Sequence, residues 1–303
     1  MILDLRTVAA EHLATRRARG YRLADHDWLI RSFIDGLERR GVATITVADA
    51  LAFARLPETD RRWHAYRLVV IRDFARYVHS IDPAAAELVP AGLIHSRVVR
   101  RHPYLYSDGQ VEALLCAASA LSPRAIAATM HTFIGLLSVS GMRSGEAIAL
   151  DVGHLDIDQQ VLTVTGKYDK KRVVPLHPSV VEELAKYLGG RGAQEPFFLG
   201  VKGGRLNANT ARAIFRQLVN QCRLDPRPGC GTPRLHDFRH RFGVNSLVDA
   251  QRSGSDIDAR VAVLADYLGH VDAACTYWYL EASPELMAAV SERVAAFFSG
   301  NAR

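Results

Sequence analysis

The spacing of apolar residues in the first hundred positions predicts a compact group of helices. From about Asp25 to Arg40 the apolar positions fall on one face of a helix, and Gly41 ends the pattern. Residues 46–49 have the sequence of a capping box, which begins a short helix, and a longer helix follows over about 59–79. The pattern therefore predicts a helical N-terminal domain at residues 1–95.

The second part of the chain combines helical spacing with one stretch of alternating residues. Between about 154 and 178 polar and apolar residues alternate, which predicts an antiparallel hairpin that turns at Tyr168 and Asp169. Helices are predicted at about 107–121, 123–139, 179–188, 209–221, 236–250, 257–268 and after Ser283. We therefore predict a mainly α fold with a small antiparallel β-sheet, in which residues 106–303 form a mixed α/β domain.

A short basic segment, residues 96–105, lies between the two predicted domains. It lacks helical periodicity and contains Arg97, Arg100 and Arg101. Arginines in such a linker can lie along the phosphate backbone of DNA, and a solvated linker has the same composition. We therefore expect either DNA contacts from these three arginines or a linker that only joins the domains.

The composition favours a soluble protein with a phosphate-bearing partner. The chain has 303 residues, a formal net charge of +6 and 33 arginines among its 38 basic residues. It has no apolar stretch long enough to cross a membrane and no signal peptide, so we expect a cytoplasmic protein that does not associate with membranes. The four cysteines form no C-x-x-C pair, which argues against a zinc site or a disulfide framework.

Four short motifs in the second domain carry side chains suited to phosphate chemistry. The segment 141–146, GMRSGE, breaks the chain before a helix, and Lys167 lies just before the hairpin tip. His236 and Arg239 are three residues apart and would share one face of a helix. The segment 268–280, LGHVDAACTYWYL, contains a histidine and two tyrosines. Each motif alone is typical of a surface, cap or core position, so their order carries the information.

In this order the motifs resemble the catalytic domain of the tyrosine recombinases, also called phage integrases. The resemblance covers about residues 104–298, and the helical segment 1–90 is similar to the family's core-binding domain in a looser way. It implies cleavage and rejoining of double-stranded DNA through a covalent 3′-phosphotyrosyl intermediate, without a metal or other cofactor. The implied catalytic residues are Arg143, Lys167, His236, Arg239, His270 and Tyr279.

The resemblance implies a nucleophile and a group of side chains that bind the phosphate. Tyr279 would attack the phosphodiester and form a bond that can later be reversed. Arg143 and Arg239 would bind the non-bridging oxygens and stabilise the charge of the transition state. Glu146 is a supporting residue that would position Arg143 or His236.

The remaining residues would carry protons or contact the phosphate. Lys167 would protonate the departing 5′-oxygen, His236 would serve as the acid–base partner near the tyrosine, and His270 would hydrogen-bond the phosphate. The family often has a second glycine after the hairpin lysine, and this chain does not. Lys170 and Lys171 therefore stay open as alternatives for the general acid. Because the histidines have these roles, no metal site is predicted from them.

The geometry of the segment 268–280 distinguishes its two tyrosines. Nine residues on one continuous helix would place His270 and Tyr279 on opposite faces, so the chain must break between them, at Gly269 and the potential N-cap Asp272. On the helix that follows, Tyr277 and Tyr279 lie about 200° apart, and only one can face DNA. The spacing from the histidine selects Tyr279, and we expect Tyr277 to pack.

The last predicted helix has a clear start and an apolar face. Ser283 is suited to cap it, and Pro284 is suited to its first position. An apolar stripe follows at Leu286, Val290, Val294 and Phe297. The resemblance implies that this helix docks onto a neighbouring protomer in a synaptic homotetramer, and packing within the same chain is the alternative.

Related activities remain open at this stage. A type IB topoisomerase would share the catalytic residues and relax supercoils as a monomer, and a DNA-binding protein of the same ancestry would lack catalysis. The apolar last helix and the six filled positions favour a recombinase. The tail 276–287, TYWYLEASPELM, is similar to that of recombinases on bacterial mobile elements. We therefore expect transposition or integration, with partner recombinases as a further expectation. The motifs do not specify the DNA target.

Overall fold

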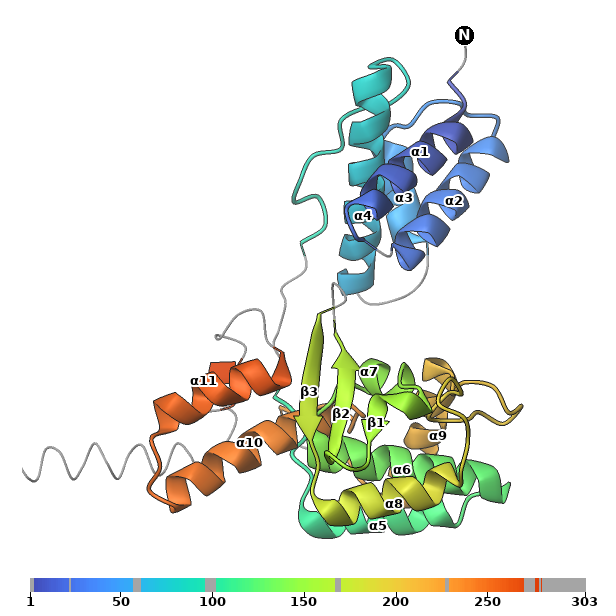
Figure 1. Cartoon of the computed structure of the whole chain (residues 1–303). Helices are drawn as coiled ribbons and strands as arrows, with labels where there is room; N and C mark the ends of the chain where they lie inside the picture. The colour runs from blue at the N-terminus through green and yellow to red at the C-terminus, as the bar shows by residue number, and fades with distance from the viewer. Residues whose placement is uncertain are drawn as a thin grey trace, which may run out of the picture. The chain divides into compact units, whose positions relative to one another are not determined.

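The computed structural model describes residues 3–21, 23–56, 61–95, 102–166, 170–226, 229–269, 276–277 and 279. The chain divides into two compact units, Met1–Arg100 and Arg101–Arg303 (Figure 1). Each unit has its own hydrophobic core. The division falls inside the segment 96–105 that the sequence marks as a linker. The three linker arginines at positions 97, 100 and 101 lie outside the described residues.

The first unit consists of four described helices, as the apolar spacing predicts in outline. They are α1 (Leu5–Ala18), α2 (Ala24–Glu38), α3 (Val47–Arg55) and α4 (Arg61–Ile81). The capping box is confirmed at α3, where the Thr46 side chain accepts from the Asp49 backbone N–H and the Asp49 side chain accepts from that of Thr46. Leu29, Ile30 and Phe33 of α2 are buried, so the predicted face of this helix forms part of the core.

The second unit combines a small sheet with helices. Its elements are α5 (Asp108–Ser119), α6 (Arg124–Ser140), α7 (Ser144–Ile148), the 3₁₀ turn Val152–His154, β1 (Leu155–Asp156), β2 (Val161–Thr165), β3 (Lys171–Pro175), α8 (Pro178–Leu188), α9 (Ala208–Gln221), α10 (Asp237–Arg252) and α11 (Ile257–Leu268). The strands run antiparallel in the order β1-β2-β3, and the β2–β3 register pairs Val161 with Pro175 and Thr165 with Lys171. This confirms the predicted mainly α fold with a small antiparallel sheet.

Helix α6 lies in the core of the second unit because apolar residues cover most of its circumference. Met130, Phe133 and Ile134 are all fully buried in it. The helix ends at Gly141, which has a φ of 60° and allows the chain to turn directly into the segment before α7. A Cβ at Gly141 would lie 2.6 Å from Cδ1 of Phe242, so α10 packs closely against this turn. The glycine thus brings the start of α7 and the side of α10 together.

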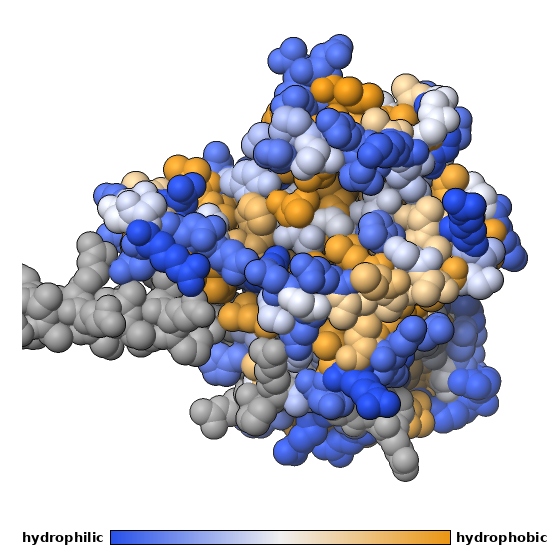
Figure 2. Space-filling view, turned by 90° about the horizontal axis from the view of Figure 1, so that it is seen from below, coloured by the Kyte–Doolittle hydropathy of each residue, from blue (hydrophilic) through white to orange (hydrophobic). Residues whose placement is uncertain are grey.

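No helix among the described residues is long and apolar enough to cross a lipid bilayer. Figure 2 shows hydrophilic and hydrophobic side chains interspersed over the face that it presents. The predicted helix after Ser283 lies outside the described residues, so its docking stays a prediction.

Candidate active site

Four of the six predicted catalytic residues are described, and two helices of the second unit, α7 and α10, carry three of them. Arg143 is the N-cap of α7, His236 is the N-cap of α10, and Arg239 lies in the first turn of α10. The positive charge of Arg143 acts on both His236 and Arg239, and the charge of Arg239 interacts with Tyr279. The structure therefore brings these four side chains into one neighbourhood. Lys167 and His270 lie outside the described residues.

Arg239 is held rigidly at the centre of this neighbourhood. Its side chain is buried, with the residue only 1% exposed, and it donates 3.0 Å to the Gly141 carbonyl and 2.7 Å to the Leu268 carbonyl. These carbonyls end α6 and α11, where the partial negative charge of a helix C-terminus favours a cation. Burial, followed by the charge of Arg143, lowers the pKa of Arg239 to about 10, so the guanidinium still carries its charge at neutral pH.

Glu146 connects two arginines through one carboxylate. Arg143 donates to it from its guanidinium at 2.7 Å and from its backbone N–H at 2.9 Å. Arg172, on β3, donates through both terminal nitrogens, at 2.7 and 3.2 Å. Burial alone would raise the pKa of Glu146, but the hydrogen bonds from Arg172 and Arg143 outweigh it and lower the pKa to about 2. The sequence predicted that Glu146 would position either Arg143 or His236, and in the structure its hydrogen bonds are with Arg143.

His236 lies at the exposed end of α10 among positive charges. Partial loss of solvent, followed by the charges of Arg239, Arg234 and Arg143, lowers the pKa of His236 to about 4. Its imidazole is therefore neutral at physiological pH in the absence of DNA. The turn before α10 is fixed by buried Asp237, which accepts from the backbone and the guanidinium of Arg234, both at 2.8 Å.

Tyr279 packs against the face of α10 that carries the catalytic positions. It is 2% exposed, and its ring lies 5.6 Å from the ring of His240. A Cβ at Gly243 would lie 2.7 Å from the Tyr279 ring, so the absence of a side chain at Gly243 makes room for it. Because Gly243 follows Arg239 by one helical turn, the tyrosine and the buried arginine lie along the same side of the helix.

One expectation about the aromatic segment is wrong. Tyr277 was expected to pack, yet it is 47% exposed, and Tyr279 occupies the buried position instead. The two side chains do point to different sides, as their spacing requires, but the side that faces α10 is that of Tyr279. Gly269 ends α11 with a φ of 66°, so this helix stops before His270, and the expected break between His270 and Tyr279 stays a prediction. Asp272 lies outside the described residues.

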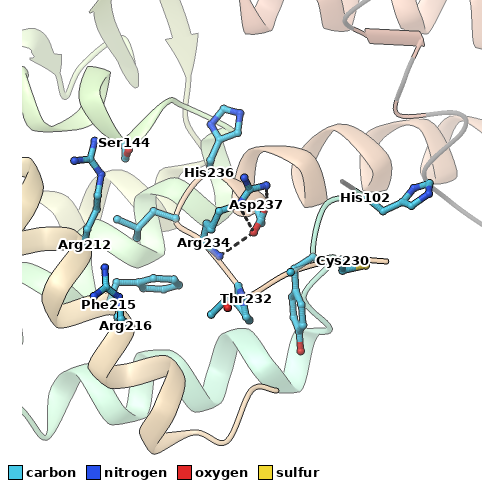
Figure 3. A pocket seen from close by; sticks show the side chains of 14 residues that line it. His102, Ser144, Arg212, Phe215, Arg216, Cys230, Thr232, Arg234, His236 and Asp237 are labelled. Atoms are coloured by element: carbon cyan, nitrogen blue, oxygen red, sulfur yellow. Dashed lines mark hydrogen bonds and ion pairs between the residues drawn. The ribbon is translucent and has the colours of Figure 1, made fainter. Parts of the chain in front are cut away.

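A cavity of about 620 Å³ opens beside His236. Figure 3 shows Arg212 and Arg216 entering it from α9, with Ser144 and the Arg234–Asp237 pair on its other walls. Three guanidinium groups thus surround a space next to the candidate acid–base histidine, which suits an anionic backbone. Helical periodicity predicts α9 but not the surface that it faces, so sequence reasoning missed Arg212 and Arg216.

Several other predicted features can be placed. The alternative general acids, Lys170 and Lys171, are both exposed at the start of β3. His240 lies between the rings of His236, at 4.8 Å, and Tyr279. Within the described part of the chain, no group of three or more histidine, cysteine, aspartate or glutamate side chains could hold a metal ion. The sequence did not identify Arg172 as a site residue. Arg172 shares a strand face with buried Val174, and this inward position on β3 was the feature that could have identified it.

Comparison with known proteins gives a consistent result. The model of the phage integrase family matches residues 105–285. The chain is 37% identical over 303 residues to a putative integrase/recombinase, y4rB, of Sinorhizobium fredii (strain NBRC 101917 / NGR234), covering 95% of this chain and 96% of the relative. It is 34% identical over 186 residues to the tyrosine recombinase XerC of Rhodospirillum centenum (strain ATCC 51521 / SW), covering 59% of this chain and 51% of that protein.

Solved structures with a similar fold include an integrase bound to DNA. A crystal structure of a lambda integrase dimer bound to a COC′ core site matches with a TM-score of 0.64 at 18% identity, covering 91% of this chain and 77% of that chain. At this identity the likeness is one of fold, and it confirms the predicted fold class.

Proposed function

The chain belongs to the phage integrase family, and from that premise we propose that it cuts and rejoins double-stranded DNA as a site-specific tyrosine recombinase. The observation that carries the proposal is the convergence of Arg143, Arg239 and His236 on the side of α10 against which Tyr279 packs. Two guanidinium groups and a neutral imidazole beside a phenol are the groups that phosphodiester transesterification by tyrosine requires.

In the proposed reaction Tyr279 is the nucleophile and the phosphorus is its target. The phenolic oxygen forms a bond to phosphorus while the bond to the 5′-oxygen breaks, which leaves a 3′-phosphotyrosyl link and a free 5′-hydroxyl. Arg143 and Arg239 bind the non-bridging oxygens, and the charge of Arg239 favours the phenolate. Attack of a 5′-hydroxyl from another strand reverses the step and joins the new partners.

Proton transfer is assigned to the remaining groups. Neutral His236 accepts the phenolic proton, since an imidazole with a lowered pKa is available as a base at neutral pH. Lys167 donates a proton to the departing 5′-oxygen, with Lys170 and Lys171 as alternatives, and His270 hydrogen-bonds the phosphate. The carboxylate of Glu146 is engaged by two arginines, and that of Asp237 by Arg234, so we propose chemistry that requires no metal.

DNA also needs a path past the reacting phosphate. We place the adjoining backbone in the cavity beside His236, where Arg212 and Arg216 supply positive charge one helical turn apart. The linker arginines at positions 97, 100 and 101 are proposed to contact the backbone as well. Because Tyr279 is 2% exposed, its hydroxyl must become accessible before it attacks.

The protein is further proposed to act as an oligomer in a defined biological process. The bound dimer of the lambda integrase structure supports an oligomeric complex on DNA. We propose a synaptic homotetramer in which the helix after Ser283 docks onto a neighbouring protomer, with partner recombinases taking part. The y4rB relative is named as a putative integrase/recombinase, which supports an integrase, and we propose integration or transposition as the process.

The decisive test is covalent capture. Nicked suicide substrates that tile the DNA flanking the gene should trap the protein on one of them, visible as a protein–DNA adduct on a denaturing gel. Tyr279→Phe should abolish the adduct, and Tyr277→Phe is the matched control that keeps it. Adducts that persist in Tyr279→Phe would show that another residue is the nucleophile. No adduct with any substrate that the wild-type protein binds specifically would favour a DNA-binding protein without catalysis.

A second assay separates the two enzymatic alternatives. A site-specific recombinase exchanges strands between two DNA molecules that carry the target, whereas a type IB topoisomerase relaxes supercoiled DNA without a partner site. Recombinant joints between differently labelled substrates are the expected product. Relaxation without recombinant joints would favour the topoisomerase.

A further inference from the structure

Arg172 is the guanidinium in this neighbourhood that the proposed reaction leaves without a role. It lies on β3, its side chain is only 15% exposed, and it donates two hydrogen bonds to Glu146. Arg143 donates to the same carboxylate. The three side chains therefore hold two positive charges and one negative charge, with Glu146 between the arginines.

Backbone from two further segments closes around Arg172. A Cβ at Gly269 would lie 3.5 Å from Nη1 and 3.6 Å from Cδ of Arg172, and a Cβ at Gly166 would lie 3.6 Å from Nη1. Gly166 immediately precedes the hairpin residue Lys167, and Gly269 immediately precedes His270. Arg172 therefore lies between the two backbone positions from which the chain continues to these candidate catalytic residues.

Stability alone is a poor explanation for this arrangement. A buried ion pair is often no more stabilising than a well-packed apolar side chain, because both charges lose their hydration. In addition, Nε of Arg172 is buried and has no hydrogen-bond partner among the described residues. A buried donor that makes no hydrogen bond destabilises the fold. An arginine that costs stability at a reacting site is better explained by what it does to its neighbours.

We propose that Arg172 is a positioning residue that neutralises Glu146, so that Glu146 can orient Arg143 without cancelling the charge that Arg143 presents to the phosphate. This inference rests on the proposed function, since it assumes that Arg143 binds the scissile phosphate. Glu146 fixes the direction of Arg143 through its hydrogen bonds. Without a counter-charge from Arg172, the same carboxylate would compete with the phosphate for that guanidinium.

The test is a set of variants at two positions, read by the rate of adduct formation on the suicide substrate. Arg172→Met should slow the adduct by about tenfold or more while DNA affinity changes little. Arg172→Lys keeps the charge and should retain most of the rate. The double variant Arg172→Met with Glu146→Gln should be faster than Arg172→Met, because removing the carboxylate also removes the need for its counter-charge.

The double variant separates this role from simple packing. If Arg172 only filled space, removing Glu146 as well would damage the site further, so a double variant no faster than Arg172→Met would overturn the proposal. Wild-type rates in Arg172→Met would overturn it as well. Thermal unfolding is recorded for each variant, and Arg172→Gln, which keeps a donor for Glu146, takes the place of Arg172→Met if the latter does not fold.

Failure of the proposed chemistry would look different. A wild-type protein that binds DNA without forming an adduct would refute the nucleophile assignment. In that case the proposed role of Arg172 is tested separately, by measuring how strongly inorganic phosphate stabilises each variant. Phosphate that binds the folded state raises the unfolding temperature. The rise should be smaller in Arg172→Met than in the wild-type protein and should return in the double variant. Equal rises in all three proteins would overturn the role of Arg172.

Discussion

Substitution of Gly141 tests how the site is built, because this residue has both a left-handed backbone conformation and a close contact with Phe242. Its φ of 60° disfavours any residue with a side chain, and a Cβ there would lie 2.6 Å from Cδ1 and 2.9 Å from Cγ of Phe242. Alanine in this backbone conformation costs about 1–2 kcal/mol, and overpacking adds about 1–3 kcal/mol. Gly141→Ala should therefore lower the free energy of unfolding by about 2–5 kcal/mol.

Gly189 provides the matched control for this substitution. It ends α8 with a φ of 57°, and nothing lies within 4 Å of the position that a Cβ would take. Gly189→Ala should therefore cost only the backbone term, about 1–2 kcal/mol, or a few degrees in the unfolding temperature of a unit of this size. Chemical denaturation of the two variants measures the difference. Equal costs would refute the claim that α10 packs directly onto the turn at Gly141.

Gly141→Ala should also affect catalysis more than binding. The Gly141 carbonyl accepts a hydrogen bond from Arg239, and Arg143 follows two residues later, so a shifted turn misplaces both guanidinium groups. A displacement of about 1 Å can cost about 100-fold in rate. Adduct formation by Gly141→Ala should fall accordingly at temperatures where the variant is folded, and Gly189→Ala should react as the wild type does. A folded Gly141→Ala variant with the wild-type rate would show that the turn does not position these arginines.

Three further outcomes follow from the same geometry. Arg239→Ala should abolish adduct formation while DNA binding, measured by gel shift, falls far less; equal losses would indicate a binding module. The NMR titration of His236 in DNA-free protein should have its midpoint near pH 4, because burial and then the nearby arginine charges lower its pKa, and bound DNA should raise the midpoint because a phosphate favours the imidazolium; a midpoint near 6.5 would contradict both the burial of the ring and the proximity of the arginines. Adduct formation should continue in EDTA, and loss that Mg²⁺ restores would refute a metal-independent reaction.

The sequence predicted the elements of the fold well because their signals are local. The capping box at Thr46 and the alternating residues around the hairpin both depend on neighbours within a few positions, and both are confirmed. The start of α10 was placed at His236, whereas His236 is the N-cap and the helix begins at Asp237. A difference of one residue at a helix end is small, but it puts the imidazole outside the regular turn that carries Arg239.

Parts of the site could not be predicted because they depend on which surfaces meet. The spacing of Tyr277 and Tyr279 fixes the angle between them, but the sequence does not say which side turns toward α10. The same limit explains Arg172. Alternation places it on the inner face of β3, and only the approach of β3 to α7 shows that its partner is Glu146.

The charge balance of the site connects these observations. The charges of Arg143 and Arg172 both act on Arg239, and both arginines bind the carboxylate of Glu146, so three positive charges and one negative charge share this neighbourhood. Burial lowers the pKa of Arg239 and of His236, and the neighbouring arginine charges lower both further, so the excess charge opposes protonation of these groups. An incoming phosphodiester relieves the same repulsion, so the free energy that the folded protein loses to its own charges is recovered when it binds an anion. A divalent cation would increase the repulsion, and the carboxylate that could attract one is already engaged by two arginines. In the proposed reaction we therefore expect guanidinium groups, without a metal, to hold the phosphate.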